Sequence, residues 1–335
     1  MDNSNKIVPP HLNAEVYRTD TTGTNTISNL DHLQIHPDGT MLVGCSELTG
    51  RYWNGGCRVF KTVAEGEQLI KDSKMSVYLS SGTADGCFVE DSSRVLLCED
   101  SGAVSIWSNN KDAWQTWNED ISVAEHDNAV LGVDCLDSGK EYVTVGGDGN
   151  IKVWDINEMI CIRNYIAAHN MAIYGVAVQP KSLNTFVTAS LDQYVSLWSE
   201  NIAKPIAGKV ILKNDCAIRC VQWLDDHKVV YGDEAGVLRT IDIRNTDNAQ
   251  KLTAFPAPVH KLAVNSDSTM VAVCCDNKIV TVCDISEPGN CKTVYHDRHM
   301  HSKYVRSVAW DVKNKNDLIT VGWDGTIKTH KNIGT

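Results

Sequence analysis

The chain has 335 residues and a formal net charge of −11, from 31 basic and 42 acidic residues. This balance argues against a direct nucleic-acid partner, which needs a basic face. The N-terminus lacks the apolar core of a signal peptide, and no apolar run approaches a membrane span, so no membrane partner is expected. The twelve cysteines form no Cys-x-x-Cys pair and lie among aliphatic residues, which predicts buried, reduced thiols in an intracellular protein.

The N-terminal part divides into two segments. Residues 1–10 are polar and end in two prolines, which predicts a flexible terminus ahead of one domain over residues 11–335. Alternating apolar residues predict a strand over residues 12–18. A loop rich in Thr, Gly and Asn follows.

A first repeat comes next. Residues 30–36, a Pro-Asp-Gly turn and residues 41–44 read as strand, turn and strand, and a third strand ends at Phe60. Residues 47–56 connect the second and third strands, and this connection is longer than the two-residue turns found elsewhere in the chain.

Two tandem segments in the middle of the chain share one pattern. Each has a His, a Thr, an Asp in a turn and a Trp at nearly the same spacings: His126, Thr144, Asp148 and Trp154, then His169, Thr188, Asp192 and Trp198. A period of about 40–45 residues that ends in Trp-Asp is the signature of a WD40 blade. Because a four-stranded blade cannot bury both faces alone, blades stack around a central channel. The pattern predicts an all-β propeller.

The four recurring residues predict a hydrogen-bonded chain within each blade. A buried Trp indole needs an acceptor, which the Thr hydroxyl supplies, and the His can join that Thr to the turn Asp. Such a chain satisfies four buried polar groups at once. A catalytic His/Asp pair needs to occur only once, so we interpret this repeated set as structural.

The later repeats keep the pattern to different degrees. The fifth has lost it, the sixth keeps His260 and Asp276, and the seventh has His301, Thr320 and Asp324. One position in the third strand of each repeat recurs about every 45 residues. The residues at this position are Phe60, Trp107, Trp154, Trp198, Ile241, Val282 and His330. His330 stands where the seventh Trp would be. These residues predict a seven-bladed WD40 β-propeller. The chain ends soon after the last third strand, so we expect the N-terminal strand to complete blade 7 and close the ring.

No catalytic motif is recognisable, and we expect neither an enzyme nor a cofactor. His296, His299 and His301 could be read as a metal site, but His301 already belongs to the repeat and the others lie in a polar loop, so no metal is expected. Trp114 and Trp117 could stack a ligand, although packing within an outer strand is the preferred interpretation.

The long connection of blade 1 carries the candidate binding residues. Trp53 is additional to the repeat position held by Phe60, and it stands with Leu48, Arg51 and Tyr52 in a segment that we expect to be a Gly-flanked hairpin loop. A protruding Trp–Arg pair is typical of interface anchors. The alternative is a Trp folded down onto blade 1 or blade 7.

These residues carry a family resemblance. The stretch Leu48-Thr-Gly-Arg51-Tyr-Trp53-Asn-Gly resembles the first repeat of the methylosome protein 50 family, the WD-repeat partners of protein arginine methyltransferase 5. Residues 100–107, 232–236 and 320–324 match as well, so the resemblance covers nearly the whole chain. The proline-rich N-terminus of that family is much reduced here.

The resemblance implies a function. It implies a non-catalytic methylosome subunit, cytoplasmic and nuclear, that binds and stabilises a type II (symmetrically dimethylating) arginine methyltransferase in a hetero-octamer. Trp53 would enter the N-terminal barrel of the enzyme with Arg51 beside it. The subunit would help to present Arg-rich substrates such as histone tails and Sm proteins. A general WD40 adaptor, for example the substrate receptor of a ubiquitin ligase, is the alternative.

Overall fold

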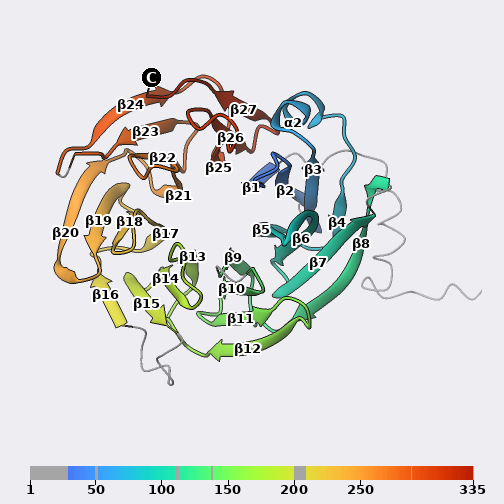
Figure 1. Cartoon of the computed structure of the whole chain (residues 1–335), viewed down its shortest axis with the longest axis horizontal. Helices are drawn as coiled ribbons and strands as arrows, with labels where there is room; N and C mark the ends of the chain where they lie inside the picture. The colour runs from blue at the N-terminus through green and yellow to red at the C-terminus, as the bar shows by residue number, and fades with distance from the viewer. Residues whose placement is uncertain are drawn as a thin grey trace, which may run out of the picture.

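Seven antiparallel sheets stand in a ring around a central channel (Figure 1). The computed structural model describes residues 29–49, 52–110, 113–136, 139–199, 209–287 and 289–334. Each sheet is built from strands that follow one another in the sequence and in space, so every blade is a meander. The predicted seven-bladed propeller is confirmed.

The strands fall into four concentric positions. The inner strands are β1 (Asn29–Ile35), β5 (Thr83–Val89), β9 (Val130–Cys135), β13 (Ile173–Val178), β17 (Ile218–Trp223), β21 (Val259–Val264) and β25 (Val305–Trp310). The second strands are β2 (Met41–Thr49), β6 (Asp91–Glu99), β10 (Glu141–Gly146), β14 (Thr185–Ser190), β18 (Lys228–Asp233), β22 (Met270–Cys275) and β26 (Leu318–Gly322). The third are β3 (Tyr52–Phe60), β7 (Ala103–Asn110), β11 (Ile151–Asp155), β15 (Tyr194–Ser199), β19 (Val237–Asp242), β23 (Val280–Asp284) and β27 (Ile327–His330). The outer strands are β4 (Val77–Leu79), β8 (Ala113–Ala124), β12 (Ile160–Tyr165), β16 (Lys209–Lys213), β20 (Asn245–Ala254) and β24 (Lys292–Asp297).

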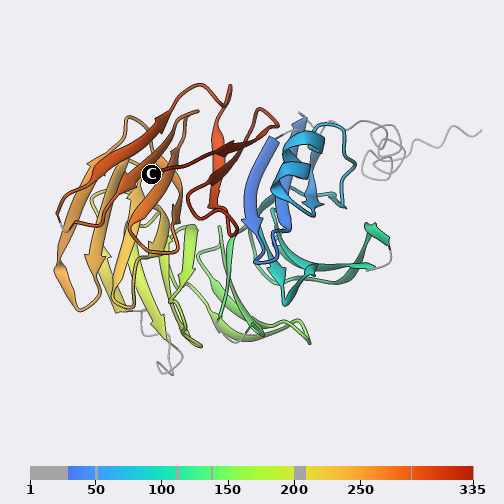
Figure 2. The same ribbon diagram turned by 45° about the horizontal axis from the view of Figure 1, so that its top comes forward.

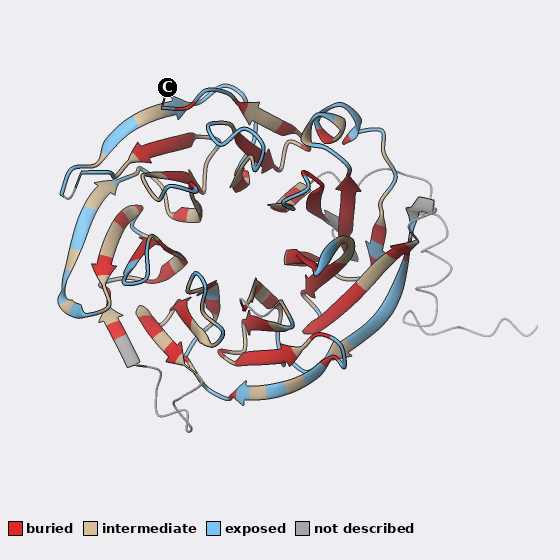
Figure 3. Cartoon of the chain, viewed as in Figure 1, coloured by how far each residue is buried: buried red, intermediate tan, exposed pale blue. Residues whose placement is uncertain are grey.

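Burial falls from the second strands to the outer ones (Figure 3). Strand β22 is buried at every position after Met270, whereas β20 has no buried residue. A second strand is covered on both faces by neighbouring blades, so it reads as a continuous apolar run rather than an alternating one.

The hydrophobic cores lie between blades. One core joins Val143 and Val153 of blade 3 to Phe186 and Trp198 of blade 4. Hydrogen bonds also cross these boundaries: Trp223 Nε1 of blade 5 donates to a carbonyl oxygen of blade 4 at 2.9 Å. Each blade therefore depends on its neighbours for burial.

The ring closes between blades 7 and 1. A shared core contains Leu30 and Met41 of blade 1 with Ile319 and Val321 of blade 7. Blade 7 shows β25, β26 and β27 within the described ranges. The predicted closing strand over residues 12–18 lies outside the described residues.

A short helix, α2 (Val63–Leu69), links β3 to the outer strand of blade 1 (Figure 2). The Thr62 hydroxyl caps it by accepting from the Glu65 amide at 3.2 Å, and Glu65 in turn accepts from the Lys61 amide at 2.8 Å. This helix was not among the elements predicted from the sequence. Within the described part of the chain, no helix has the length and apolar character needed to cross a membrane.

Candidate functional site

The repeated polar residues of blade 3 form one hydrogen-bonded chain. His126 Nδ1 lies 3.0 Å from a carboxylate oxygen of Asp148, and its Nε2 lies 3.0 Å from Thr144 Oγ1. Trp154 Nε1 donates to the same Oγ1 at 2.8 Å, with the Trp154 side chain fully buried. Blade 4 repeats this arrangement with His169, Thr188, Asp192 and Trp198 at distances from 2.8 to 3.1 Å.

The electrostatics of these hydrogen-bonded networks favour a structural role over a catalytic one. Burial raises the pKa of Asp148, but hydrogen bonds from His126 and the Asn150 amide outweigh it and bring that pKa down to about 2. Burial lowers the pKa of His169, against the raising effect of Asp192. An imidazole with both nitrogens engaged has no free atom with which to move a substrate proton.

Blade 7 builds the same chain with a histidine in the Trp position. His301 Nδ1 lies 3.1 Å from Asp324 and its Nε2 lies 2.8 Å from Thr320 Oγ1. His330 Nε2 lies 2.9 Å from that Oγ1, and Tyr295 Oη lies 2.8 Å from His330 Nδ1. A hydroxyl has only one proton, so if Thr320 donates it to His301 Nε2, the Thr320 oxygen must accept a hydrogen bond from His330 Nε2–H. His330 then donates to Thr320 as the Trp indole N–H does in blades 3 and 4.

Blades 5 and 2 build a buried polar network from other residue types. Asp233 is fully buried, accepts from Asn214 Nδ2 at 3.1 Å and pairs with Arg239. In blade 2, Trp107 Nε1 donates to Ser105 Oγ at 3.1 Å. Ser105 Oγ donates in turn to Glu99 at 2.9 Å. Glu99 and Asp233 each end the second strand of their blade and do not lie in the turn after it, so spacing alone missed these networks.

Blade 6 does not form the repeat network that its sequence retains. His260 Nδ1 and Asp276 are 3.9 Å apart, which is too long for a hydrogen bond. Arg219 and Arg306 instead pair with Asp276 at 3.0 and 3.2 Å. The neighbouring arginines bind the Asp276 carboxylate, and His260 instead lines the channel cavity described below.

Blade 1 carries an extended hairpin rather than a long loop. Residues 47–49 of β2 pair with 52–54 of β3, and Leu48 stands opposite Trp53 in the register. Leu48, Tyr52 and Trp53 therefore lie in strands and not in a loop as expected, while Arg51 lies outside the described residues. The pairing continues past Ser46, which is the last β2 residue paired with β1. The ribbon beyond it has no flanking strand in the described ranges.

The glycines beside Trp53 have a packing reason. Gly55 and Gly56 belong to β3 and pair with Leu79 and Tyr78 of β4. Gly56 has φ +139°, and a Cβ there would collide with the carbonyl oxygen of Val77. The expectation that these glycines flank a loop was wrong, because β4 approaches β3 too closely for a side chain.

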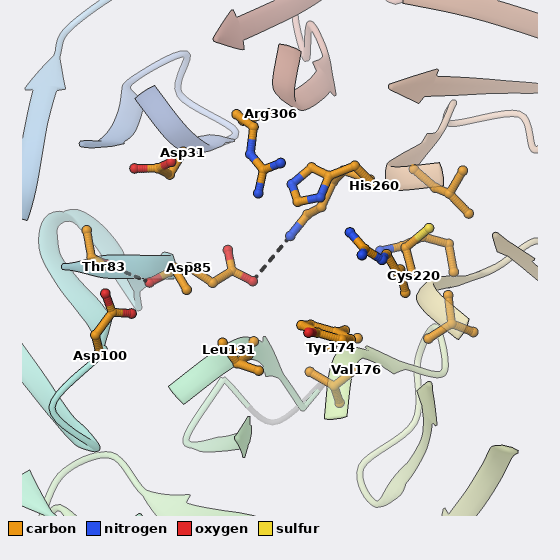
Figure 4. Close-up of a pocket in the computed structure, with 18 of the residues that line it drawn as sticks. Asp31, Thr83, Asp85, Asp100, Leu131, Tyr174, Val176, Cys220, His260 and Arg306 are labelled. Carbon is orange, nitrogen blue, oxygen red and sulfur yellow. Dashed lines mark hydrogen bonds and ion pairs between the residues drawn. The ribbon is translucent and has the colours of Figure 1, made fainter. Parts of the chain in front are cut away.

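A cavity of about 380 Å³ fills the channel at the end where the inner strands begin, termed here the upper face. Its lining includes residues from the start of every inner strand, together with Ser46 at the base of the blade 1 ribbon. Figure 4 shows Asp31, Asp85 and Asp100 on the side of blades 1 and 2, with His260 and Arg306 facing them from blades 6 and 7. The ribbon and the cavity therefore share one face of the ring.

Apart from His260, which was assigned to the repeat pattern, these channel residues were not among the residues predicted from the sequence. Asp85, Arg219, Lys261 and Arg306 occupy the second or third place of inner strands whose other residues are mostly apolar or small. An alignment of the repeats on their inner strands would have revealed this ring of charges.

The Trp of the blade 2 outer strand was considered either as a ligand-stacking residue or as part of the sheet packing. Trp117 is buried in the core of blades 1 and 2, as expected for outer-strand packing.

The histidines that were considered as a metal site have other partners. His296 Nδ1 forms a hydrogen bond with Thr281 Oγ1 at 3.1 Å, and His301 belongs to the blade 7 network. The described residues contain no group of three His, Cys, Asp or Glu side chains that could hold a metal ion. The twelve cysteines, all within the described residues, form no disulfide with one another.

Comparisons with known proteins agree with this architecture. The family model described as "WD domain, G-beta repeat" matches residues 119–155 and 289–330. Methylosome protein WDR77 of Xenopus laevis is 28% identical over 88% of this chain and 86% of its own length. WD repeat-containing protein 37 of Xenopus tropicalis is 20% identical over 61% of this chain, but only 41% of that protein is covered. Shk1 kinase-binding protein 15 of Schizosaccharomyces pombe is 33% identical over 22% of this chain.

Proposed function

As a WD40 propeller distantly related to methylosome protein WDR77, the protein serves, we propose, as the WD-repeat subunit of a methylosome. In this function it binds and stabilises a protein arginine methyltransferase of the symmetric-dimethylating type and performs no chemistry itself. The assembly would be a hetero-octamer in the cytoplasm and nucleus, with the propeller against the N-terminal barrel of the enzyme.

One observation carries the proposal. The similarity to methylosome protein WDR77 extends over 88% of this chain and 86% of that protein, so it spans nearly the whole of both proteins. The similarity to WD repeat-containing protein 37 is weaker and leaves more than half of that protein uncovered. Full-length similarity favours a shared assembly over a generic adaptor function.

The blade 1 ribbon is the proposed contact with the methyltransferase. Its strands extend past their flanking partners, and two-stranded ribbons are at best marginally stable alone in water. A partner pocket would both order the ribbon and take Trp53 as an anchor, with Leu48, Arg51 and Tyr52 around it.

The net charge of −11 supports the presentation of Arg-rich substrates, such as histone tails and Sm proteins. Complementary charge speeds encounter and favours the correct partner more than it adds affinity. The substrate would thereby be concentrated beside the enzyme.

Purification of the tagged full chain from its own cells tests the proposal. We expect an arginine methyltransferase in near-equal amount, and activity that deposits symmetric dimethylarginine in the eluate. A ubiquitin-ligase scaffold in its place, or a methyltransferase that is present only in trace amounts, would contradict the proposal.

A further inference from the structure

The cations around the upper cavity are already neutralised. Lys261 Nζ lies 3.3 Å from Asp85, across the channel from blade 6 to blade 2. Arg219 pairs with Glu234 at 2.9 Å and with Asp276 at 3.0 Å. Arg306 pairs with Asp276 at 3.2 Å and lies 4.8 Å from the centre of the Trp323 ring. The fourth basic group, His260, is held neutral because burial and the nearby arginines lower its pKa. An anion would have to displace an existing carboxylate.

Two carboxylates in the same cavity have no cation of their own. Among the described residues, the Asp100 side chain has no hydrogen-bond or ion-pair partner, and burial raises its pKa. Asp31 accepts hydrogen bonds from Ser46 and from Trp323 Nε1, the latter at 2.8 Å, but forms no ion pair within the described ranges. Burial raises the pKa of Asp31 as well and outweighs the lowering effects of the Ser46 and Trp323 hydrogen bonds and of the Arg306 charge, while the charge of Asp100 adds a smaller increase. An unpaired carboxylate that is partly desolvated is costly, so the site favours an incoming cation.

The size and the lining of the cavity indicate which kind of cation it would bind. About 380 Å³ is more than a bare ion needs and suits a long side chain that enters along the channel axis. A guanidinium is planar, always charged and more weakly hydrated than an ammonium, so it leaves water at lower cost and can donate to two carboxylates. Leu131 and Val176 in the lining offer apolar surface to its methylene stem.

We propose that the upper cavity binds an arginine side chain from an Arg-rich protein segment, with Asp31 and Asp100 as its acceptors. Only the identification of that segment as a substrate of the bound methyltransferase rests on the proposed function. Because Ser46 lines the cavity and also begins the blade 1 ribbon, a bound segment would lie next to the proposed enzyme contact.

Fluorescence anisotropy with the purified full chain, in the absence of any methyltransferase, tests the site. The probe is a labelled peptide of alternating Gly and Arg, compared with Lys and citrulline versions of the same length. Loss of one charged hydrogen bond predicts that Asp100→Asn and Asp31→Asn each weaken the Arg peptide by about 10- to 100-fold. The matched control is Asp247→Asn, which removes an exposed carboxylate from β20. It should bind within about twofold of wild type, since surface charges act weakly.

The outcomes separate the alternatives. Equal weakening by Asp100→Asn and Asp247→Asn would reduce the effect to net charge and overturn the site. Equal affinity for the Arg and Lys peptides would overturn the choice of guanidinium, and retained citrulline binding would overturn the choice of a cation. Melting curves guard against misfolding: Asp100→Asn should melt at or above the wild-type temperature, because it removes an unpaired charge. Trp53→Ala should keep peptide binding but lose the methyltransferase, so the two proposals can fail separately.

Discussion

The Tyr295 hydroxyl of blade 6 lies 2.8 Å from Nδ1 of His330 in blade 7. If His330 donates through Nε2–H to Thr320, its Nδ1 must accept, so Tyr295 is the donor. Histidine therefore reproduces the N–H that Trp154 and Trp198 supply in blades 3 and 4, and a neighbouring blade satisfies the extra nitrogen.

The first prediction concerns this pair. Tyr295→Phe leaves a buried acceptor on His330 and should lower the free energy of unfolding by about 1–2 kcal/mol. His330→Phe should cost at least as much. Because the two residues are in contact, the double variant should cost less than the sum of the single variants. Denaturant unfolding measures all three, and strict additivity would show that the hydrogen bond contributes nothing.

The second prediction concerns the repeated network. Asp148 accepts from His126, the Asp127 amide and the Asn150 amide, so Asp148→Ala should cost about 1–3 kcal/mol of unfolding free energy. Asp192→Ala should cost a similar amount. The exposed control Asp247→Ala should stay within about 0.5 kcal/mol of wild type. A network variant that unfolds like wild type but loses partner binding would mean that the network is functional rather than structural.

The third prediction is a loss of stability in mild acid. Burial lowers the pKa of His330 to about 4, against the raising effect of Asp297. Between the unfolded pKa of about 6.5 and the folded value, the unfolded state binds a proton that the folded state does not. Stability from neutral His330 is thus complete above pH 6.5 and falls as the pH drops towards 4. His169 shifts in the same direction.

Two other groups act over neighbouring pH ranges. Asp148, with a pKa of about 2, adds a further loss as the pH falls below its unfolded value of about 4. Burial raises the pKa of Asp134 to about 6, which opposes the histidines between pH 4 and 6. The melting-temperature difference between wild type and His330→Phe isolates His330. It should be constant above pH 6.5 and shrink towards pH 4, and a difference that does not change with pH would contradict the assignment.

The fourth prediction concerns Trp53. As an anchor in a partner pocket, Trp53→Ala should weaken methyltransferase binding by about 2–4 kcal/mol, or about 30- to 1,000-fold in Kd. Arg51→Ala should cost about 1 kcal/mol if its charge lies at a wetter rim. Ile166→Ala, which removes a side chain that is 69% exposed, is the matched control and should bind normally. Retained binding by Trp53→Ala would rule out the anchor, while a large drop in the melting temperature of the free chain would favour a Trp packed onto the propeller.

The fifth prediction concerns ring closure. Blade 7 ends at β27 within the described ranges, and an unpaired strand edge favours aggregation. If residues 12–18 supply the missing outer strand, deletion of residues 1–20 should lower the melting temperature and promote self-association. Light scattering and melting curves measure both effects. A truncated chain that remains monomeric with an unchanged melting temperature would exclude the assignment.

The number of blades and the networks of blades 3, 4 and 7 follow from the amino-acid sequence alone. These features are repeated and local, because Thr144, Asp148 and Trp154 lie in the first strand, the turn and the second strand of one hairpin. The sequence was also sufficient to mark the blade 1 connection as unusual. It misjudged the form of that connection, since Gly55 and Gly56 look like loop residues until β4 is seen lying against them.

The contacts that cross between blades depend on the three-dimensional arrangement of the ring. Tyr295 meets His330, Trp323 meets Asp31 and Lys261 meets Asp85 because the ring brings together residues that are 35, 292 and 176 positions apart. The substitute networks of blades 2 and 5 were hidden for a related reason, since their acidic residues, Glu99 and Asp233, end the second strand and so break the spacing of the repeat. The unpaired state of Asp100 likewise emerges only when every cation of the channel has been assigned to another carboxylate. Ring closure sets these pairings, and a linear pattern of local periods does not contain it.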